Sequence, residues 1–152
     1  MGVDSQLTLL GRAALAALLG FAIGLERESR GKSAGERTFA LLAFAASAVT
    51  GLGSLLLGPD ATSRIIPGVL AGVGFLGAGL IFRQGMGAVR GLTTAAGAWA
   101  ATAIGIVAGI GAYLAAVLGA AFILLILELD QIPFLRRLHE QAEPTGGSEP
   151  PG

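Results

Sequence analysis

The 152-residue sequence contains no cysteine and a single histidine, His139. Without cysteine, the chain has no disulfide, no thiolate metal site and no cysteine nucleophile. No nucleophile motif lies beside His139, so we assign it no role. Basic and acidic residues number 10 each, and this zero net charge argues against a nucleic-acid partner. The opening residues, MGVDSQ, include no Lys or Arg, unlike the start of a secretory signal peptide.

Charge is also scarce, at 13% of residues compared with about 25% in soluble domains. Hydrophobic residues make up 53%, and three apolar runs cover 7–25, 38–57 and 65–82. A fourth uncharged stretch, 91–127, would be about 55 Å long as one helix, whereas an apolar bilayer core is about 30 Å thick. Since glycine makes a turn inexpensive, Gly109 and Gly111 mark the expected break between two shorter spans.

The chain is therefore predicted to be an all-α, polytopic membrane helical bundle with five transmembrane helices, at about 7–25, 38–57, 65–82, 93–108 and 111–129. A short segment, 1–6, precedes this transmembrane domain of residues 7–130. The tail, 131–152, is rich in Pro, Gly, Ser and Glu and is expected to be disordered. With five spans, eight of the ten basic residues fall on one side. This bias predicts an outside N-terminus and a cytoplasmic C-terminus.

Small residues recur every four positions in the predicted spans. Because apolar surface does not drive helices together in lipid, such stripes favour close helix crossings. We expect packing roles for Gly20, Gly24, Gly68, Gly72, Gly74, Gly77, Gly79, Gly97, Gly105 and Gly109. An alternative is that Gly77 and Gly79 leave room for an ion or a substrate. Trp99 is expected to pack between helices.

The connection GLERESRGKSAGERT (24–38) carries unusual charge for this chain. Ser33 and Glu36 have the spacing of a capping box, so these charges are explained by topology and helix capping. The alternative is that Glu26 and Glu28 bind a hard cation such as Mg²⁺. The candidate cytoplasmic cluster comprises Glu26, Arg27, Glu28, Lys32, Arg37, Arg83 and Arg90.

Two further groups of charges stand out. Arg12 lies within the first span, where an ionisable residue is a functional candidate, although near a helix end its side chain can also reach the interface. Glu128 and Asp130 close the fifth span on the predicted cytoplasmic side. We expect them to be solvated charges at the helix end; the alternatives are that they join Glu26 and Glu28 or pair with Arg83 and Arg90.

Three motifs in order resemble the MgtC/SapB family of bacterial membrane proteins: GLERESRGKSAGERT, GVGFLGAGLIFRQG (72–85) and VRGLTTAAGAWAATAIG (89–105). The resemblance places family motif positions on Glu26, Arg27, Glu28, Gly31, Lys32, Gly35, Arg37, Thr38, Gly72, Gly74, Phe75, Gly77, Ala78, Gly79, Arg83, Gly91, Leu92, Thr93, Thr94 and Trp99. Many members have a histidine where this chain has Phe39, and an apolar residue at Glu36. Some members also carry a C-terminal soluble domain, which is not expected here.

The resemblance implies a bacterial cytoplasmic (inner) membrane protein associated with adaptation to low magnesium. The leading hypothesis is a non-enzymatic protein that acts through contacts with other membrane proteins or as a homodimer, within the lipid bilayer. The alternative is a small transporter or channel for Mg²⁺, another cation or protons, with an acidic cytoplasmic mouth and a pathway along spans one and three. No cofactor is expected, and Mg²⁺ binding is left open.

Overall fold

The computed structural model describes residues 1–84 and 88–129, and only the backbone of 82–84 and 88. Its α-helices are α1 (Val3–Ser29), α2 (Glu36–Leu52), α3 (Pro59–Leu80), α4 (Leu92–Gly109) and α5 (Tyr113–Glu128). A π-helical segment, η1 (Gly53–Leu57), continues α2, and two short antiparallel strands, β1 (Phe82–Gln84) and β2 (Ala88–Arg90), connect α3 to α4. The predicted five-helix bundle is confirmed. Its sidedness stays a prediction, and the tail lies outside the described residues.

Four helical segments are long and apolar enough to cross a membrane: α1, α2 with η1, α3 and α4. The apolar α5, with 16 residues, is shorter. α3 begins at Pro59 rather than near Ile65, because proline is well tolerated in a first helical turn. Asp60 therefore lies in the first turn of α3, where its negative charge interacts favourably with the positive end of the helix dipole.

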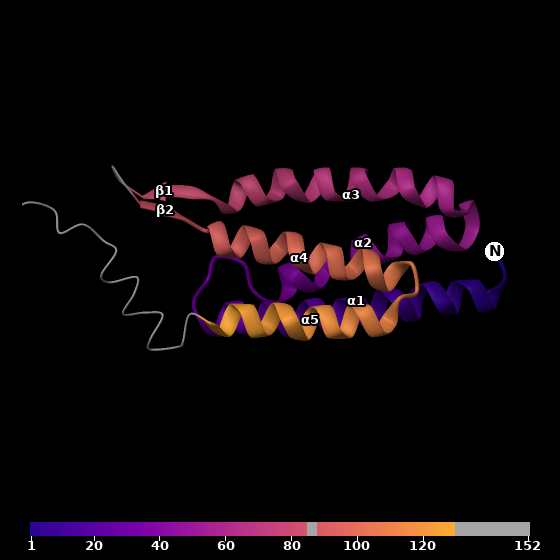
Figure 1. Cartoon of the computed structure of the whole chain (residues 1–152), viewed down its shortest axis with the longest axis horizontal. Coiled ribbons are helices and arrows are strands. Elements are labelled where there is room, and N and C mark those ends of the chain that lie inside the picture. Colours follow the sequence, from indigo (N-terminus) through magenta and orange to yellow (C-terminus); the bar gives the residue numbers. More distant parts are fainter. Residues whose placement is uncertain (85–87, 130–152) are drawn as a thin grey trace, which may run out of the picture.

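α4 is the centre of the bundle and contacts α1, α2, α3 and α5 (Figure 1). Small side chains allow these helices to approach closely, and the core includes Ala16, Ala43, Ala98, Ala101, Ala108 and Ala116. Phe39 and Ile23 fill the wider spaces and are fully buried. α3 lies at the outer side of α4 and buries little of its own surface. Trp99 is 48% exposed, so the expectation that it packs between helices is wrong.

Glycines permit the closest approaches between α1, α2 and α4. A Cβ atom added at Gly20 would lie 2.5 Å from the Phe39 carbonyl oxygen, and one at Gly109 would lie 2.7 Å from that of Ser47. The same substitutions at Gly24 and Gly105 would also collide with α2 backbone. These positions therefore hold helix backbones in direct contact, the arrangement that small-residue stripes permit in lipid.

The glycines of α3 have different surroundings. A Cβ added at Gly68, Gly72, Gly74 or Gly79 would meet nothing within 4 Å, so these residues do not pack against another part of the described chain. Gly77 faces Ala95 of α4 at an ordinary distance of 3.8 Å, and Gly97 of α4 lies against the Phe39 ring. The predicted glycines of α1 and α4 thus pack against a neighbouring part of the bundle, whereas most of those on α3 contact no other described part of the chain.

Candidate functional site

Four charged side chains join the end of α1 to the end of α5. Glu26 lies 2.7 Å from Arg27, measured from Oε2 to Nε, and also pairs with Arg30 one helical turn later. Arg30 in turn approaches Glu128 of α5, with 3.0 Å between Nη2 and Oε2. We call these residues the Glu26 cluster. Two carboxylates and two guanidinium groups balance, so the cluster has no net charge.

Burial makes this cluster unusual. The side chain of Arg27 is fully buried, and that of Glu26 is only 8% exposed. Arg27 donates from Nη2 to Glu26 at 3.1 Å, while its Nε and Nη1 make no aligned hydrogen bond. Coulomb attraction therefore contributes much of the contact between Glu26 and Arg27. Removing one partner of a buried pair leaves an uncompensated charge and typically costs about 3–5 kcal/mol.

Glu28 faces a different partner from Glu26. Its Oε2 accepts a hydrogen bond from the backbone N–H of Glu36, at 3.3 Å. The predicted capping box is wrong: α2 begins at Glu36 after Gly35, and no capping side chain from the N-cap residue bonds its first turn. Glu28 reaches the orphan N–H from the preceding helix and supplies negative charge at the positive end of α2.

The two glutamates considered as cation ligands thus have different partners within the chain. Glu26 is held by two guanidinium groups, and Glu28 bonds the start of α2. Among the described residues, no three His, Cys, Asp or Glu side chains gather closely enough to hold a metal ion. The described residues therefore offer no assembled set of ligands for Mg²⁺. Mg²⁺ binding stays a prediction.

Arg12 makes hydrogen bonds at the end of the bundle opposite the Glu26 cluster. Its Nη1 donates to the carbonyl oxygen of Gly109 at 2.7 Å, and its Nε donates to the Tyr113 hydroxyl at 3.2 Å. The guanidinium lies 5.9 Å from the centre of the Tyr113 ring. A cation at the C-terminal carbonyls of α4 interacts favourably with the helix dipole. Arg12 therefore ties α1 to the α4–α5 connection, which gives this intramembrane charge a structural partner.

The remaining basic candidates separate into three environments. Arg37 is 92% exposed and approaches only the neighbouring Glu36, at 3.6 Å. Lys32 and Arg90 line a common cavity of about 400 Å³, together with Gly31, Ser33, Gly91 and Thr94. Arg83 belongs to β1, and its side chain lies outside the described part of the structure.

Sequence reasoning did not connect Lys32 with Arg90 or identify Thr94 as their neighbour. The connection depends on β1 and β2, which return the chain from α3 to the start of α4 beside the α1–α2 connection. Three-residue strands within a charged connection give no strong alternating pattern, so composition did not predict them.

α4 separates α1 from α3 (Figure 1), so a transport pathway along both would have to pass α4. Transport stays a prediction.

Comparison with known proteins agrees with the motifs. A model of the MgtC family matches residues 13–135. The chain is similar to Protein MgtC of Brucella abortus (strain 2308), with 38% identity over 133 residues, covering 88% of this chain and 55% of the relative. It is also similar to Protein MgtC of Salmonella typhimurium (strain LT2), with 49% identity over 98 residues, covering 64% of this chain and 42% of the relative.

The chain spans about half the length of these curated relatives. No solved structure matches it significantly. The family match covers most of the chain, including the Glu26 cluster at the ends of α1 and α5 and, separately, the start of α4. Apolar helices of membrane-spanning length occupy the same region. The chain is therefore a multi-pass membrane protein, and it belongs to the MgtC family.

Proposed function

We propose that this protein is non-enzymatic and acts by binding another membrane protein through the exposed face of α3. The observation that carries this proposal is a helix of membrane-spanning length on which Gly68, Gly72, Gly74 and Gly79 meet nothing in the described part of the chain. Only 6% of its most apolar window is buried within the bundle. A helix with this composition has a surface available to a second helix within the bilayer.

The exposed glycines lie at the spacing of one helix face. Gly68, Gly72, Phe75 and Gly79 follow the pattern i, i+4, i+7 and i+11, which keeps them on one side of an α-helix. We call these four residues the α3 glycine face. The buried Val73 and Gly77 lie on the opposite side, toward the bundle. α3 therefore has one face packed on α4 and another that is left to the surroundings.

Physical chemistry favours a helix as the partner of this face. In lipid, association depends on close backbone contact and van der Waals packing, since the surrounding acyl chains are as apolar as leucine. Gly68 and Gly72 leave a shallow groove, and Phe75, which is 82% exposed, stands beside it. A partner helix fills that groove better than mobile acyl chains, and the large ring adds contact area.

The remaining parts of the proposal concern chemistry and physiology. The sequence contains no cysteine and no recognisable nucleophile–base set, which supports a role without catalysis. The family resemblance supports a link to Mg²⁺ homeostasis under limiting Mg²⁺. The bacterial inner membrane is the proposed location, and contacts in the bilayer are the proposed means of action.

Substitution of Gly72 by leucine tests the partner directly. Gly72→Leu fills the groove with a branched side chain, whereas Gly11→Leu adds the same side chain at an equally open position of α1. After solubilisation of bacterial membranes in mild detergent, we expect specific co-purifying membrane proteins to be lost from Gly72→Leu and kept by Gly11→Leu. Identical partners for wild type and Gly72→Leu would overturn the assignment of this face.

A growth experiment tests the physiological part separately. In a strain lacking its own MgtC protein, we expect wild type and Gly11→Leu to restore growth in limiting Mg²⁺, whereas Gly72→Leu does not. Equal membrane levels of the three proteins, measured by immunoblot, exclude loss of expression. Growth independent of this protein at every Mg²⁺ concentration would contradict the Mg²⁺ link. If the detergent-purified protein instead forms a single larger species made of this chain alone, the partner is a second copy of the chain and not another protein.

A further inference from the structure

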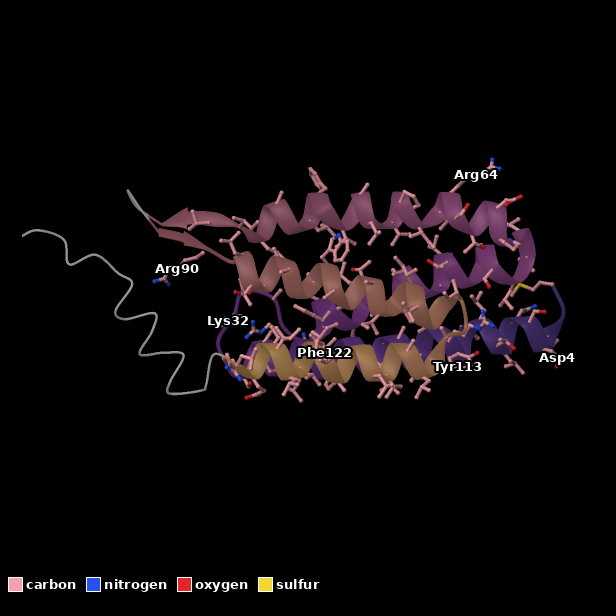
Figure 2. The ribbon with its side chains drawn as sticks, in the orientation of Figure 1. Asp4, Lys32, Arg64, Arg90, Tyr113 and Phe122 are labelled. Carbon is pink, nitrogen blue, oxygen red and sulfur yellow. The ribbon has the colours of Figure 1, made fainter. Side chains whose placement is uncertain are left out.

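We propose that the cavity between the α1–α2 connection and the start of α4 binds a phosphate group. The cavity has a volume of about 400 Å³ and is lined by Gly31, Lys32, Ser33, Arg90, Gly91 and Thr94. We call it the Lys32–Arg90 cavity. It lies at the end of the bundle opposite Arg64 and Tyr113 (Figure 2), where the apolar helices end and polar groups gather. This proposal does not depend on the role of α3.

The cavity holds two cations whose charge is not neutralised nearby. Within the described ranges, neither Lys32 nor Arg90 has an ion-pair partner, in contrast to Arg27, Arg30 and Arg37. Glu28 and Glu36 line a separate cavity, together with Arg37. Two positive charges around one space favour an anion with more than one negative oxygen.

The start of α4 adds backbone donors at the same place. The first bond within this helix runs from the N–H of Ala95 to the carbonyl oxygen of Gly91, at 2.8 Å. The N–H groups of Leu92, Thr93 and Thr94 therefore precede any acceptor in the helix, and no side chain of the N-cap residue bonds them. With 18 residues, α4 also directs the positive end of its dipole toward the cavity.

Gly91 is required for this arrangement. Its φ of 90° lies in the left-handed region, which favours glycine, and an added Cβ would collide with the carbonyl oxygen of Leu80. The chain can thus turn from β2 into α4 closely enough to line the cavity with backbone. A side chain at this position would displace the first turn of α4 from the end of α3.

Thr94 provides an independent sign that a ligand belongs in the cavity. This residue is only 3% exposed, yet it lines the cavity, and its hydroxyl makes no hydrogen bond within the described part of the chain. The hydroxyls of Thr62 and Thr102, by contrast, each bond a backbone carbonyl one turn earlier. The Thr94 hydroxyl stays accessible from the cavity, unlike the enclosed, unpaired hydroxyls of Ser47 and Thr50, and a bound oxyanion supplies it with an acceptor.

Phosphate fits this set of donors better than a carboxylate does. A phosphate monoester has three acceptor oxygens and up to two negative charges. The cavity is lined by a lysine, an arginine, a serine, a threonine and the start of a helix. Its volume lies within the range of about 300–1,000 Å³ found for small-molecule sites, which leaves room for the group that carries the phosphate.

Two phosphate sources are compatible with a cavity at the end of membrane helices, and two probes distinguish them. Native mass spectrometry of the full chain, titrated with phosphatidic acid, whose headgroup is a phosphate monoester, or with phosphatidylcholine, tests an anionic lipid headgroup. Equilibrium dialysis of the full chain with inorganic phosphate in a neutral detergent tests a soluble source. Selective binding of phosphatidic acid assigns the site to lipid, and binding of inorganic phosphate without lipid selectivity assigns it to a soluble compound. Binding of neither probe overturns the proposal.

Variants test whether the cavity is the binding site. In Lys32→Gln/Arg90→Gln, we expect at least about a tenfold loss of affinity, because charge-assisted hydrogen bonds are removed. Arg37→Gln/Arg64→Gln removes the same amount of charge from side chains outside the cavity and should bind as wild type. Thr94→Val keeps the shape, removes the hydroxyl and should weaken binding severalfold. Equal affinities of the cavity variant and its charge-matched control would overturn the proposal. Near-identical circular dichroism spectra check folding.

Discussion

Two glycine pairs with the same four-residue spacing have opposite surroundings in this protein. Gly105 and Gly109 of α4 lie directly against the backbone of α2, whereas Gly68 and Gly72 of α3 face open space. The comparison extends to whole helices, because α4 is the most buried of the four membrane-spanning segments and α3 the least. The spacing alone therefore does not reveal whether a glycine pair holds a bundle together or faces outward.

This difference divides the molecule into a packed unit and an exposed helix. α1, α2, α4 and α5 share the alanine-rich core, the Glu26 cluster and the bonds of Arg12. α3 contacts mainly α4 and η1 and buries few of its side chains. Substitutions of glycine should consequently reduce stability in the packed unit and leave it unchanged on the α3 glycine face.

The largest contrast is expected from leucine at the two kinds of position. Gly105→Leu places a large side chain against the carbonyl oxygen and Cα of Ala43, and these backbone atoms cannot move without shifting α2. We expect this variant to lose its folded, monodisperse form in detergent, while Gly72→Leu keeps it. Size-exclusion chromatography and protease resistance measure the outcome. A folded Gly105→Leu with wild-type stability would show that α2 and α4 are not closely packed.

The second contrast concerns charge. Glu26→Gln leaves Arg27 buried without its carboxylate, and we expect the free energy of unfolding to fall by about 3–5 kcal/mol, as for other broken buried pairs. Arg37→Gln changes a charge on the same connection, but its 92% exposed side chain should contribute at most about 1 kcal/mol. Unfolding in increasing dodecyl sulfate compares the two. Equal stabilities would mean that the buried pair of Glu26 and Arg27 does not stabilise the fold.

The sequence predicted the five helices well because each depends on a local feature, a long apolar run between charged connections. Contacts between distant segments were harder to predict. The link from Arg30 to Glu128 joins the ends of α1 and α5, and nothing in the spacing of either segment specifies it. Cation binding was only an alternative for Glu28, and Ser33 was expected to cap α2. Sequence spacing did not identify Glu28 as the residue that bonds the start of α2, because the fold of the connection determines which oxygen reaches that helix.

The smallest effect gives the sharpest test of the two glycine environments, since it changes a single methyl group. Gly20→Ala places its Cβ 2.5 Å from the Phe39 carbonyl oxygen and 2.8 Å from the Ala43 side chain, so α1 and α2 must separate. Overpacking of this kind typically costs about 1–3 kcal/mol. Gly72→Ala meets no atom, and the higher helix propensity of alanine, worth up to about 1 kcal/mol, makes this variant equally or slightly more stable. Unfolding of both variants in the same detergent mixture measures the sign of each change, and the two signs should differ. Equal destabilisation would show that α3 also depends on its glycines for folding, and the α3 glycine face would then belong to the bundle itself.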